Sequence, residues 1–596
     1  VLQWDFHKPE VKWFSGGKLN ITENCIDRHL EKMGDKPAII WEPNNPEERV
    51  RVVTYNRLHK RVCQFAQVLL NNGVKKGDRV CIYMGMVPEL AYAVLGCARI
   101  GAIHSVIFGG FSAQSISDRL QDANAEFIIT CDGAYRGNIP LKSVIDDALI
   151  GSRQVKKVIV YTRTRTPISM IKGRDVWWED EMDRAEEMLE AHNGHLPAEE
   201  MDAEDPLFIL YTSGSTGKPK GVVHTSGGYM VFSAYSFVNV FQYQPGDIHF
   251  CTADIGWITG HSYIVYGPLC AGATSVMFEG IPTWPNAGRF WEIIDKHKVN
   301  ILYTAPTAIR SLMGFGLDPV KGKDLSTLKV LGTVGEPINE EAWHWYNENI
   351  GKKRCPIVDT WWQTETGCIM ISNIAGVTDS KPTYATLPLP GIQPVLVDEN
   401  GVEITGNNVS GNLCIKAPWP SILRTTYGDH ERCRLNYFST YPNYYFTGDG
   451  ALRDENGLYR ITGRVDDVLH ASGHRIGTAE VENAINMHSG VVESAVVGYP
   501  HNIKGQGIYA FVIYQSSTHN DENLTRADIL QTVSRVIGPI AKPDKIQFVS
   551  GLPKTRSGKI MRRILRKIAE GEIANLGDTS TLLDPTVVDS IKDGRL

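Results

Sequence analysis

The sequence predicts an α/β fold in which a large N-terminal domain of parallel or mixed sheets, flanked by helices, is followed by a small C-terminal α+β domain. Three observations lead to this prediction. The chain has 596 residues, more than one compact core needs, so two or more domains are expected. Short apolar runs rich in β-branched residues alternate with helical stretches. The structural units then become shorter towards the C-terminus.

The apolar runs in the first part of the chain have the length and composition of buried strands. Such runs, separated by helical stretches such as 87–102, favour parallel sheets covered by amphipathic helices. The expected strands are, in chain order, 78–84, 126–131, 156–162, 206–212, 273–278, 300–306 and 328–334.

The C-terminal part is expected to hold its own small core. Glycines and polar residues over 463–477 mark the seam. We therefore place the large domain at 1–465 and the small domain at 466–596. The expected units of the small domain are a helix over 479–487, strands at 493–499 and 509–515, a helix over 526–536 and a basic segment at 553–569.

Composition excludes several classes of protein. The chain has 61 Lys and Arg and 67 Asp and Glu, which gives a formal charge of −6. This charge lacks the excess of basic residues that proteins binding nucleic acid or anionic lipid usually have. No apolar run reaches the ~18 residues of a membrane helix, and the opening residues lack the pattern of a signal peptide. The eleven cysteines form no metal-spaced cluster and indicate reduced thiols. We expect a cytoplasmic protein with neither nucleic-acid nor membrane partners.

A glycine-rich loop is the sharpest local signal. YTSGSTGKPKGVVHT, at 211–225, directly follows an expected strand, and its backbone N–H groups can turn around a phosphate chain. It is not a Walker A loop, because Thr212 and Pro219 stand where that motif needs Gly and Ser or Thr. Taken alone, the loop fits a flexible linker as well as a phosphate site.

Several motifs in order resemble the adenylate-forming enzymes, the superfamily of acyl-CoA synthetases, luciferases and peptide-synthetase adenylation domains. Its phosphate loop is similar to YTSGSTGKPKG, and the later motifs are VGEPI at 334, DTWWQTETG at 359, YFTGDGALRDENGLYRITGRVDD at 445 and PKTRSGKIMRR at 553. Within the superfamily, GWITGHSYIVYGPL at 256 and VIFGGFSA at 106 resemble the AMP-forming acetyl-CoA synthetases. The resemblance covers nearly the whole chain.

The resemblance implies an acetate–CoA ligase that works in two steps. The carboxylate attacks the α-phosphate of ATP to give acyl-AMP and pyrophosphate, and the CoA thiol then displaces AMP. The implied ligands are acetate, ATP, CoA and Mg²⁺, because two anions meet in the first step and need compensating charge. Lys559 matches the lysine that bridges carboxylate and α-phosphate, and Thr364 and Glu365 match the pair that lines the magnesium position.

The resemblance also implies the nucleotide site. Asp449 matches the residue that holds the ribose, and Arg464 and Arg475 match phosphate-contacting arginines. Taken alone, Asp449 would also fit an ordinary turn, and the two arginines would fit surface ion pairs. In the same way, Thr364 and Glu365 alone would fit a helix N-cap with its first-turn acid. The remaining matches are the phosphate loop, Thr212, Ser213, Gly214, Ser215, Thr216, Gly217 and Lys218, and the walls of the adenine and phosphate site, Gly335, Glu336, Pro337, Asp359, Thr360, Trp361 and Gln363.

An acetate pocket is implied by four positions: Ile258, Thr259, Val334 and Trp362, the last of which caps the far end. Ile258 departs from the valine expected in the family and adds about one methylene, which is worth roughly 1 to 3 kcal/mol in a hydrophobic pocket. We therefore predict strong rejection of propionate. The alternative is that Ile258 is a core residue whose extra carbon points elsewhere.

The resemblance is thinner for CoA and for the metal. The CoA matches are Phe108, Gly109, Gly110, Arg136, Gly473 and Arg535, with a single arginine beside the first loop and Ser534 where another is expected. His488 and Val491, with Glu365, match positions at the magnesium site, although His488 also fits a structural role.

The family implies a mobile small domain and control at its lysine. The small domain turns about a hinge acid, here Asp466, which alone would fit a helix cap. Acylation of Lys559 by a lysine acyltransferase, reversed by a deacylase, would remove the charge that the first step needs. The alternatives left open are a propionate or other short-chain acyl-CoA synthetase, a carrier-loading adenylation domain and a binding protein that has lost catalysis.

Overall fold

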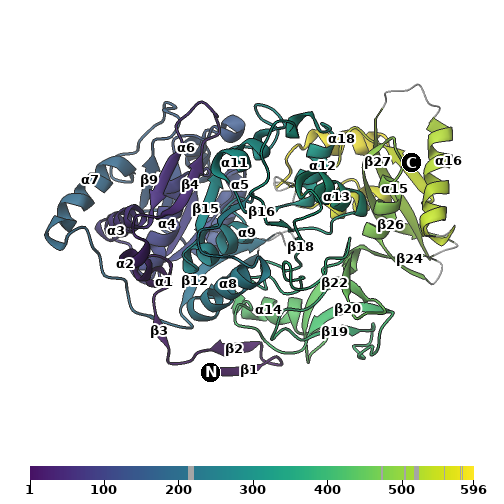
Figure 1. The fold of residues 1–596 in the computed structure, drawn as a ribbon, viewed down its shortest axis with the longest axis horizontal. Helices are drawn as coiled ribbons and strands as arrows, with labels where there is room; N and C mark the ends of the chain where they lie inside the picture. The colour runs from purple at the N-terminus through teal and green to yellow at the C-terminus, as the bar shows by residue number, and fades with distance from the viewer. Residues whose placement is uncertain are drawn as a thin grey trace.

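The computed structural model describes residues 1–212, 220–471, 474–502, 505–515, 522–537, 539–555, 558–577, 579 and 581–596, with only the backbone of several residues between 466 and 480, Asp466 and Arg475 among them. Figure 1 shows a large N-terminal region of sheets and helices and a small C-terminal unit at its side. The predicted α/β fold class is confirmed.

Two mostly parallel sheets form the centre of the large region. In each, most neighbouring strands run parallel, and parallel neighbours need crossover connections, which are mostly helical. The eight-stranded sheet has the order β10 (Asp175–Trp177), β9 (Lys157–Tyr161), β8 (Phe127–Cys131), β6 (Arg79–Tyr83), β7 (Ile103–Val106), β12 (Pro206–Thr212), β13 (Lys220–Thr225) and β21 (Thr425–Thr426). The seven-stranded sheet has the order β18 (Ile357–Asp359), β17 (Val330–Thr333), β16 (Ile301–Thr304), β14 (Ile248–Cys251), β15 (Thr274–Phe278), β4 (Pro37–Glu42) and β5 (Arg51–Thr54).

Helices cover these sheets, and one of them differs from the expectation. The stretch 87–102 was expected to be amphipathic, but all twelve residues of α4 (Pro88–Arg99) are buried, because α4 contacts α3, β6 and β7 together. Its Arg99 is neutralised by Asp27 at 2.8 Å. The other helices of the region are α1 (Ile21–Cys25), α2 (Leu30–Met33), α3 (Tyr55–Asn71), α5 (Ala113–Ala123), α6 (Leu141–Ala148), α7 (Trp178–Leu189), α8 (Ser226–Val240), α9 (Ile258–Gly260), α10 (Gly267–Cys270), α11 (Arg289–His297), α12 (Pro306–Met313), α13 (Glu340–Trp345) and α14 (His430–Tyr437).

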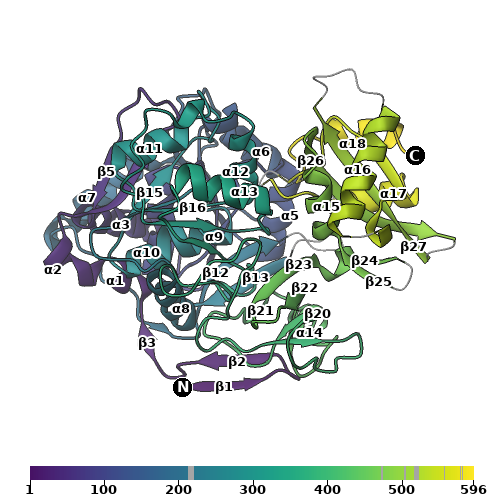
Figure 2. The ribbon, with the colours of Figure 1, turned by 45° about the vertical axis from the view of Figure 1, so that its right-hand side comes forward.

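A third, antiparallel sheet was not expected from the sequence. Its order is β19 (Pro394–Val397), β20 (Val409–Ile415), β22 (Tyr445–Arg453) and β23 (Tyr459–Arg464). Strands β22 and β23 pair with Asp449 opposite Arg464, which places two predicted site residues side by side. In Figure 2 this sheet lies beneath the small C-terminal unit. Short pairs formed by β1 (Leu2–Asp5) with β2 (Glu10–Trp13), and by β3 (Lys18–Leu19) with β11 (Met201–Asp202), complete the region.

The C-terminal unit is a separate sheet covered on both faces. Strand β26 alternates, with Val496 packing into one apolar cluster and Ala495 and Val497 into another. The chain passes to this sheet after β23, near the boundary at residues 465 and 466, which stays a prediction. Its elements are β24 (Val468–Ala471), β25 (His474–Gly477), α15 (Thr478–Asn486), β26 (Val491–His501), β27 (Gly505–Tyr514), α16 (Glu522–Val536), β28 (Lys545–Phe548), α17 (Arg562–Glu570) and α18 (Thr586–Asp593).

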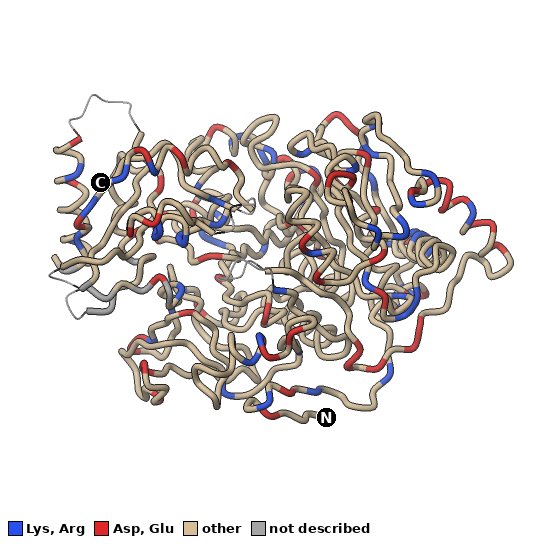
Figure 3. Tube along the Cα trace, turned by 180° about the vertical axis from the view of Figure 1, so that it is seen from behind, with Lys and Arg blue, Asp and Glu red and all other residues tan. Residues whose placement is uncertain are grey.

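Charges of both signs are interspersed along the chain. Figure 3 shows Lys and Arg next to Asp and Glu over the face seen from behind. This agrees with the small net charge of the sequence. Among the described helices, none is both long enough and apolar enough to cross a membrane. All eleven cysteines are buried and free.

Candidate active site

Asp449 is the centre of the candidate site. It lies on β22 and is 7% exposed. Its Oδ2 accepts hydrogen bonds from Trp361 Nε1 at 3.1 Å and from Gln363 Nε2 at 2.9 Å, and its Oδ1 lies 3.3 Å from Arg464 Nη1. Burial raises the pKa of Asp449, and the positive charge of Arg464 opposes this shift. The structure thus brings four residues of two separate motifs into contact.

The segment after β18 is held by its own hydrogen bonds. Gln363 Nε2 also donates to the Thr447 carbonyl at 2.7 Å, and its Oε1 accepts from Tyr445 at 2.8 Å. Thr364 and Glu365 lie in a turn and not at the helix N-cap that would have been the simple explanation of the pair. The turn therefore presents Glu365 by tertiary contacts.

Glu365 shares a partly buried polar site with Lys220 and Tyr437. The Tyr437 hydroxyl donates to Glu365 Oε1 at 2.7 Å and accepts from Lys220 Nζ at 2.9 Å, and Lys220 Nζ lies 3.9 Å from the same carboxylate. Burial raises the pKa of Glu365, but the Lys220 charge and the Tyr437 hydrogen bond outweigh it, so the pKa lies below its usual range. Glu365 is therefore held as a carboxylate, a hard oxygen ligand of the kind that Mg²⁺ takes.

The ends of neighbouring parallel strands form the wall opposite. Thr304, Thr333 and Asp359 end β16, β17 and β18 and are adjacent in register. The next residues of each chain segment, including Gly335 and Thr360, therefore emerge at one edge of the sheet, where α/β folds place their ligands. Gly335 has a φ of +96°, a backbone conformation that favours glycine.

Asp359 is buried at this edge with one hydroxyl partner. Thr333 Oγ1 donates to its Oδ1 at 2.8 Å. Burial raises the pKa of Asp359 to about 7, although the Thr333 hydrogen bond opposes the shift. The neighbouring Thr360 hydroxyl is 2.8 Å from the Thr333 carbonyl and 2.6 Å from the Tyr303 hydroxyl.

Glu336 is held in place by α12, although its side chain is only half-buried. It accepts from the Thr307 backbone N–H at 2.8 Å and from the Thr307 hydroxyl, and its Oε2 pairs with Arg310 at 2.8 Å. The pKa of Glu336 is raised by burial and lowered by Arg310 and Thr307, with a net shift downwards. Pro337 lines a small cavity with Arg460 and Thr462 of β23 and with Ala479 of α15.

The four predicted acetate-pocket residues belong to one apolar region. Ile258 and Val334 are buried in the main core cluster, and Trp362 packs against it. Trp362 donates from Nε1 to the Tyr303 hydroxyl at 3.1 Å and meets the Tyr263 ring edge-on at 5.1 Å between centroids. Thr259 follows Ile258 in the short helix α9 and is half-buried. Tyr263 and Tyr303 thus orient Trp362, and neither tyrosine was predicted from the sequence.

Most of the predicted phosphate loop, Ser213 to Lys218, lies outside the described residues. Its first residue, Thr212, ends β12, and its buried Oγ1 has no hydrogen-bond partner among the described residues. A buried hydroxyl without a partner costs free energy unless a ligand or water completes it. Lys220, at the start of β13, is the residue of this loop that the sequence analysis missed. The sequence feature that could have indicated Lys220 is its place as the second lysine of GKPKG.

Lys559 lies on a tight turn of the small C-terminal unit. The Thr555 backbone N–H donates to the Lys559 carbonyl at 2.8 Å, and the Lys559 N–H donates to Thr555 Oγ1 at 3.1 Å. Gly558, with a φ of +85°, closes the turn so near to α12 that an added Cβ would lie 3.3 Å from Thr307 Cγ2. The turn therefore packs against the large region beside Glu336.

The surroundings of Lys559 come from both parts of the chain. Desolvation and the charge of Arg464 lower the pKa of Lys559, whereas Asp449, Asp467 and Glu365 raise it, and the net shift is downwards. The Lys559 side chain is nonetheless exposed, so solvent also reaches it. The charges of Asp449 and Glu365 in the large region therefore act on Lys559 across the boundary between the two parts.

Charged groups lie on both sides of the boundary between the two parts. Arg562 of α17 pairs with Glu482 of α15 at 2.6 Å within the small unit. Burial lowers the pKa of Arg562, but the negative charges of Glu482 and of Glu336 in the large region help to raise it above its usual range. Burial lowers the pKa of Arg310, but its partner Glu336 and, to a smaller extent, Glu493 and Glu482 of the small unit raise it, with a net shift upwards. Charge complementarity thus spans the boundary.

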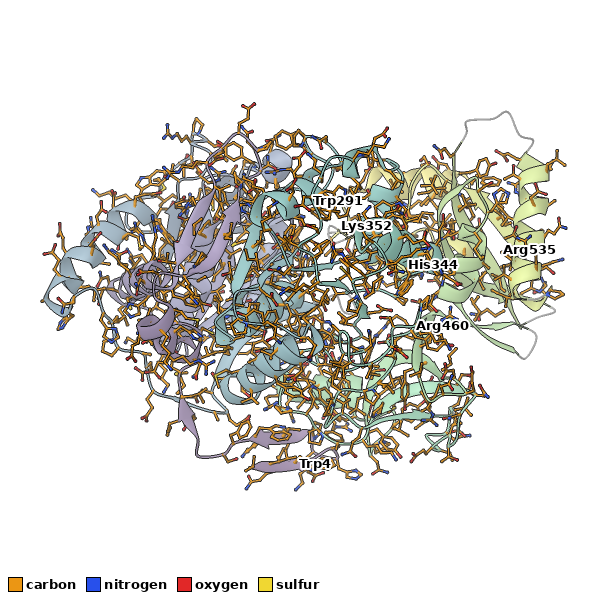
Figure 4. The ribbon with its side chains drawn as sticks, viewed as in Figure 1. Trp4, Trp291, His344, Lys352, Arg460 and Arg535 are labelled. Atoms are coloured by element: carbon orange, nitrogen blue, oxygen red, sulfur yellow. The ribbon has the colours of Figure 1, made fainter. Side chains whose placement is uncertain are left out.

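The predicted CoA residues are only partly brought together. Arg136 lies 5.7 Å from the centre of the Phe108 ring and 3.2 Å from Asp254 Oδ2. Gly109 and Gly110 follow Phe108 after β7. Arg535 is exposed on α16, at the outer side of the small unit, where Figure 4 labels it. Gly473 lies outside the described residues.

The remaining predicted residues lie around the boundary. His488 is in the turn between α15 and β26, where its Nδ1 accepts from the Gly490 N–H at 3.1 Å, and Val491 begins β26. In the described part of the chain, Glu365 and His488 do not form a group with converging ligand atoms. Asp466 lies in a short 3-10 segment, 465–467, and Arg475 lies on β25, but neither side chain is described.

Comparisons with known proteins identify the family. The model of the AMP-binding enzymes matches residues 26–424, and the model of the AMP-binding enzyme C-terminal domain matches 480–559. Acetyl-coenzyme A synthetase 2 of Pseudomonas aeruginosa is 58% identical over 598 residues, covering 100% of this chain and 91% of the relative. The acetyl-coenzyme A synthetase of Rhizobium meliloti is 59% identical over 591 residues, covering 98% and 90%. The chain belongs to the acetyl-coenzyme A synthetase family of AMP-binding enzymes.

The family assignment and the geometry cover the same residues. The C-terminal family model ends at Lys559, and the N-terminal model includes the loop at Thr212 and the strand ends at Asp359. Asp449 and Arg464 lie between the two models, in a part covered by the full-length acetyl-coenzyme A synthetase relatives.

Proposed function

We propose that this chain catalyses the AMP-forming ligation of acetate to CoA, through acetyl-AMP, with release of AMP and pyrophosphate. One observation carries the proposal: the chain is 57–59% identical to acetyl-coenzyme A synthetases over 98–100% of its length. The charges of Arg464, Asp449 and Glu365 in the large region, which act on Lys559 of the small C-terminal unit, support it. ATP, acetate and CoA are the substrates.

In the adenylation step, Lys559 binds the acetate carboxylate and the α-phosphate together. Its positive charge offsets the repulsion between the two anions, which grows as they approach. The loop Thr212 to Lys218 binds the phosphates, and Arg464 and Arg475 add charge. Thr364 lies beside Glu365, whose carboxylate would hold Mg²⁺. The bound ion would neutralise phosphate charge. His488 and Val491 are the proposed further metal positions.

Asp449 binds the ribose in this proposal, because one carboxylate accepts from two neighbouring hydroxyls. Trp361 and Gln363 support it through the hydrogen bonds to Oδ2. The segments Gly335 to Pro337 and Asp359 to Thr360 form the walls around the adenine and the phosphates. Acetate lies between Ile258, Thr259, Val334 and Trp362.

The thioester step needs a different arrangement, because Lys559 must reach the phosphate in the first step and leave room for the thiol in the second. We propose that the small domain, 466–596, turns about Asp466. CoA then binds at Phe108 to Gly110, Arg136, Gly473 and Arg535. An Asp466→Pro variant should impair one half-reaction more than the other; equal loss of both would contradict the hinge.

Regulation and location follow from the same chemistry. A lysine acyltransferase acting on Lys559, opposed by a deacylase, would stop adenylation and spare the thioester step. The eleven free, buried thiols support a reducing compartment such as the cytoplasm.

The experiment measures AMP formation with ATP and Mg²⁺ over acetate, propionate and butyrate, with and without CoA. Acetate should dominate, and sustained AMP formation should require CoA. If propionate gave the same rate of AMP formation as acetate, the proposed substrate would become short-chain acids in general. No AMP with any acid would overturn it.

A further inference from the structure

A second cluster of chemically competent side chains lies away from the active site. His59 and Cys63 are one turn apart on α3, and His195 follows the end of α7 in the chain. In Figures 1 and 2, α3 lies on the side of the large region opposite the small C-terminal unit. One ligand atom from each residue lies within 4.8 Å of the others, and among the described His, Cys, Asp and Glu side chains only this group of three or more does so.

The two distances from His59 Nε2 to the other ligand atoms match those of a tetrahedral metal site. His59 Nε2 lies 3.1 Å from His195 Nδ1 and 3.5 Å from Cys63 Sγ. In a tetrahedral zinc site with ordinary bond lengths, two nitrogens lie about 3.3 Å apart, and nitrogen and sulfur about 3.6 Å apart. Two of the three pairs of atoms therefore already have the spacing of zinc ligands, and the third pair, Cys63 Sγ and His195 Nδ1, lies within 4.8 Å.

The sequence favours this geometry. Residues four apart on a helix share a face, and paired ligands at this spacing bind zinc in other helices. Cys63 is buried, whereas His195 is exposed, so an ion can enter from solvent on one side.

The segment that carries His195 is held in place. The carbonyl of the next residue, Leu196, accepts from Arg99 Nε at 2.7 Å and contacts Cys63 Sγ at 3.8 Å. Further along, the Glu199 carbonyl accepts from Asn20 Nδ2 at 2.9 Å. Arg99 forms an ion pair with Asp27, so the positive charge of Arg99 near the cluster is neutralised.

We propose that His59 Nε2, Cys63 Sγ and His195 Nδ1 bind one Zn²⁺ ion, with water in the fourth position. On binding, the Cys63 thiol releases its proton to solvent and the thiolate sulfur forms the bond to zinc. Cys and His are the ligands that zinc prefers, whereas Mg²⁺ takes oxygen, so this ion is distinct from the magnesium of the adenylation chemistry. The site ties α3 to the segment after α7, and its role is structural.

The alternative is a hydrogen-bonded chain from the Cys63 thiol through His59 to His195 without a metal. The test uses the full chain, stripped with a chelator and titrated with Co²⁺, which replaces zinc and absorbs light when bound to thiolate. We expect one Co²⁺ per chain with a thiolate-to-cobalt band, displaced by one equivalent of Zn²⁺.

Variants make the test decisive. Cys63→Ser should abolish the thiolate band, and His195→Gln should weaken Zn²⁺ binding at least about 100-fold, more than the loss of an outer partner costs. His344→Gln, an exposed histidine on α13, is the matched control and should bind as the wild type does. AMP formation by His195→Gln should remain normal, which shows that it folds. Absence of a thiolate band in the wild type, or unchanged binding in both ligand variants, would overturn the proposal.

Discussion

Lys220 and Glu365 are linked through one hydroxyl group. Tyr437 donates to the Glu365 carboxylate at 2.7 Å and accepts from the Lys220 ammonium at 2.9 Å, and the two charged groups lie 3.9 Å apart. Both side chains are about 15% exposed, so solvent screens the pair little. The strand after the phosphate loop is thus joined to the proposed magnesium ligand.

Replacing Lys220 should therefore weaken the use of magnesium and ATP together. In Lys220→Met the pKa of Glu365 rises, because burial then acts without the opposing charge. We expect kcat for AMP formation to fall about 10- to 100-fold, with a higher Mg²⁺ requirement at low pH. The measurement is the Mg²⁺ dependence of adenylation at two pH values.

Tyr437→Phe is the companion variant, since it removes the shared hydroxyl and keeps both charges. It should show a smaller change in the same direction. A Lys220→Met enzyme whose Mg²⁺ dependence does not change with pH would show that Lys220 does not act through Glu365.

The acetate pocket gives a second prediction. Ile258 is 8% exposed at the start of α9, in the same apolar cluster as Val334. Ile258→Val removes about one methylene and should raise the propionate-to-acetate ratio of kcat/KM by about 10-fold or more. The ratio is measured for both acids under the same conditions.

The length of the pocket is tested separately by Trp362→Gly. This variant removes the ring that Tyr303 and Tyr263 orient, and it should admit longer acids. Strict use of acetate by Trp362→Gly would refute the capping role. An unchanged ratio in Ile258→Val would mean that the extra carbon points into the core.

The strands of the two parallel sheets were predictable because they are buried on both faces. The runs at 78–84, 126–131 and 156–162 contain β6, β8 and β9, since an unbroken β-branched run leaves few alternatives. The antiparallel sheet of β19, β20, β22 and β23 was not predictable. The YFTGDG segment of β22 carries Gly448 at a φ of +71°, and its glycines interrupt the alternation of apolar and polar residues.

The candidate site could be predicted where a motif supplied the residue. Asp449, Arg464, Trp361 and Gln363 come from motifs and are in contact. Tyr437 could not be found in this way, because it is one of 23 tyrosines and reaches Glu365 only through tertiary packing of α14.

The pKa of Asp359 predicts how stability depends on pH. Burial raises this pKa to about 7, above the value of about 3.9 in an unfolded chain. Between these two pKa values the folded state binds more protons than the unfolded state. The contribution of Asp359 to the free energy of unfolding is therefore full at low pH and is lost as the pH rises towards 7. Each unit is worth about 1.4 kcal/mol, so the loss amounts to a few kcal/mol.

Asp359→Asn should remove that contribution, because the amide has no proton to lose. The difference in melting temperature between pH 5 and pH 8, measured by calorimetry without nucleotide, should be smaller in the variant than in the wild type. Thr333→Val is the matched control, since it removes the partner of Oδ1 and leaves the carboxyl group able to titrate. Identical pH dependence of Asp359→Asn and the wild type would contradict a raised pKa.

Lys559 separates the two half-reactions. Lys559→Gln removes the charge between carboxylate and phosphate, as acylation would, and should lower acetyl-AMP formation about 100- to 1,000-fold. Thioester formation from supplied acetyl-AMP and CoA should stay close to the wild-type rate. In the wild type, the lowered pKa of Lys559 means that adenylation declines with rising pH before an ordinary lysine would lose its proton. Lys567→Gln, on α17, is the control for a neighbouring charge and should keep both half-reactions. If Lys559→Gln lost both half-reactions equally, a specific role of Lys559 in adenylation would be contradicted. A residue needed only for adenylation should leave thioester formation intact.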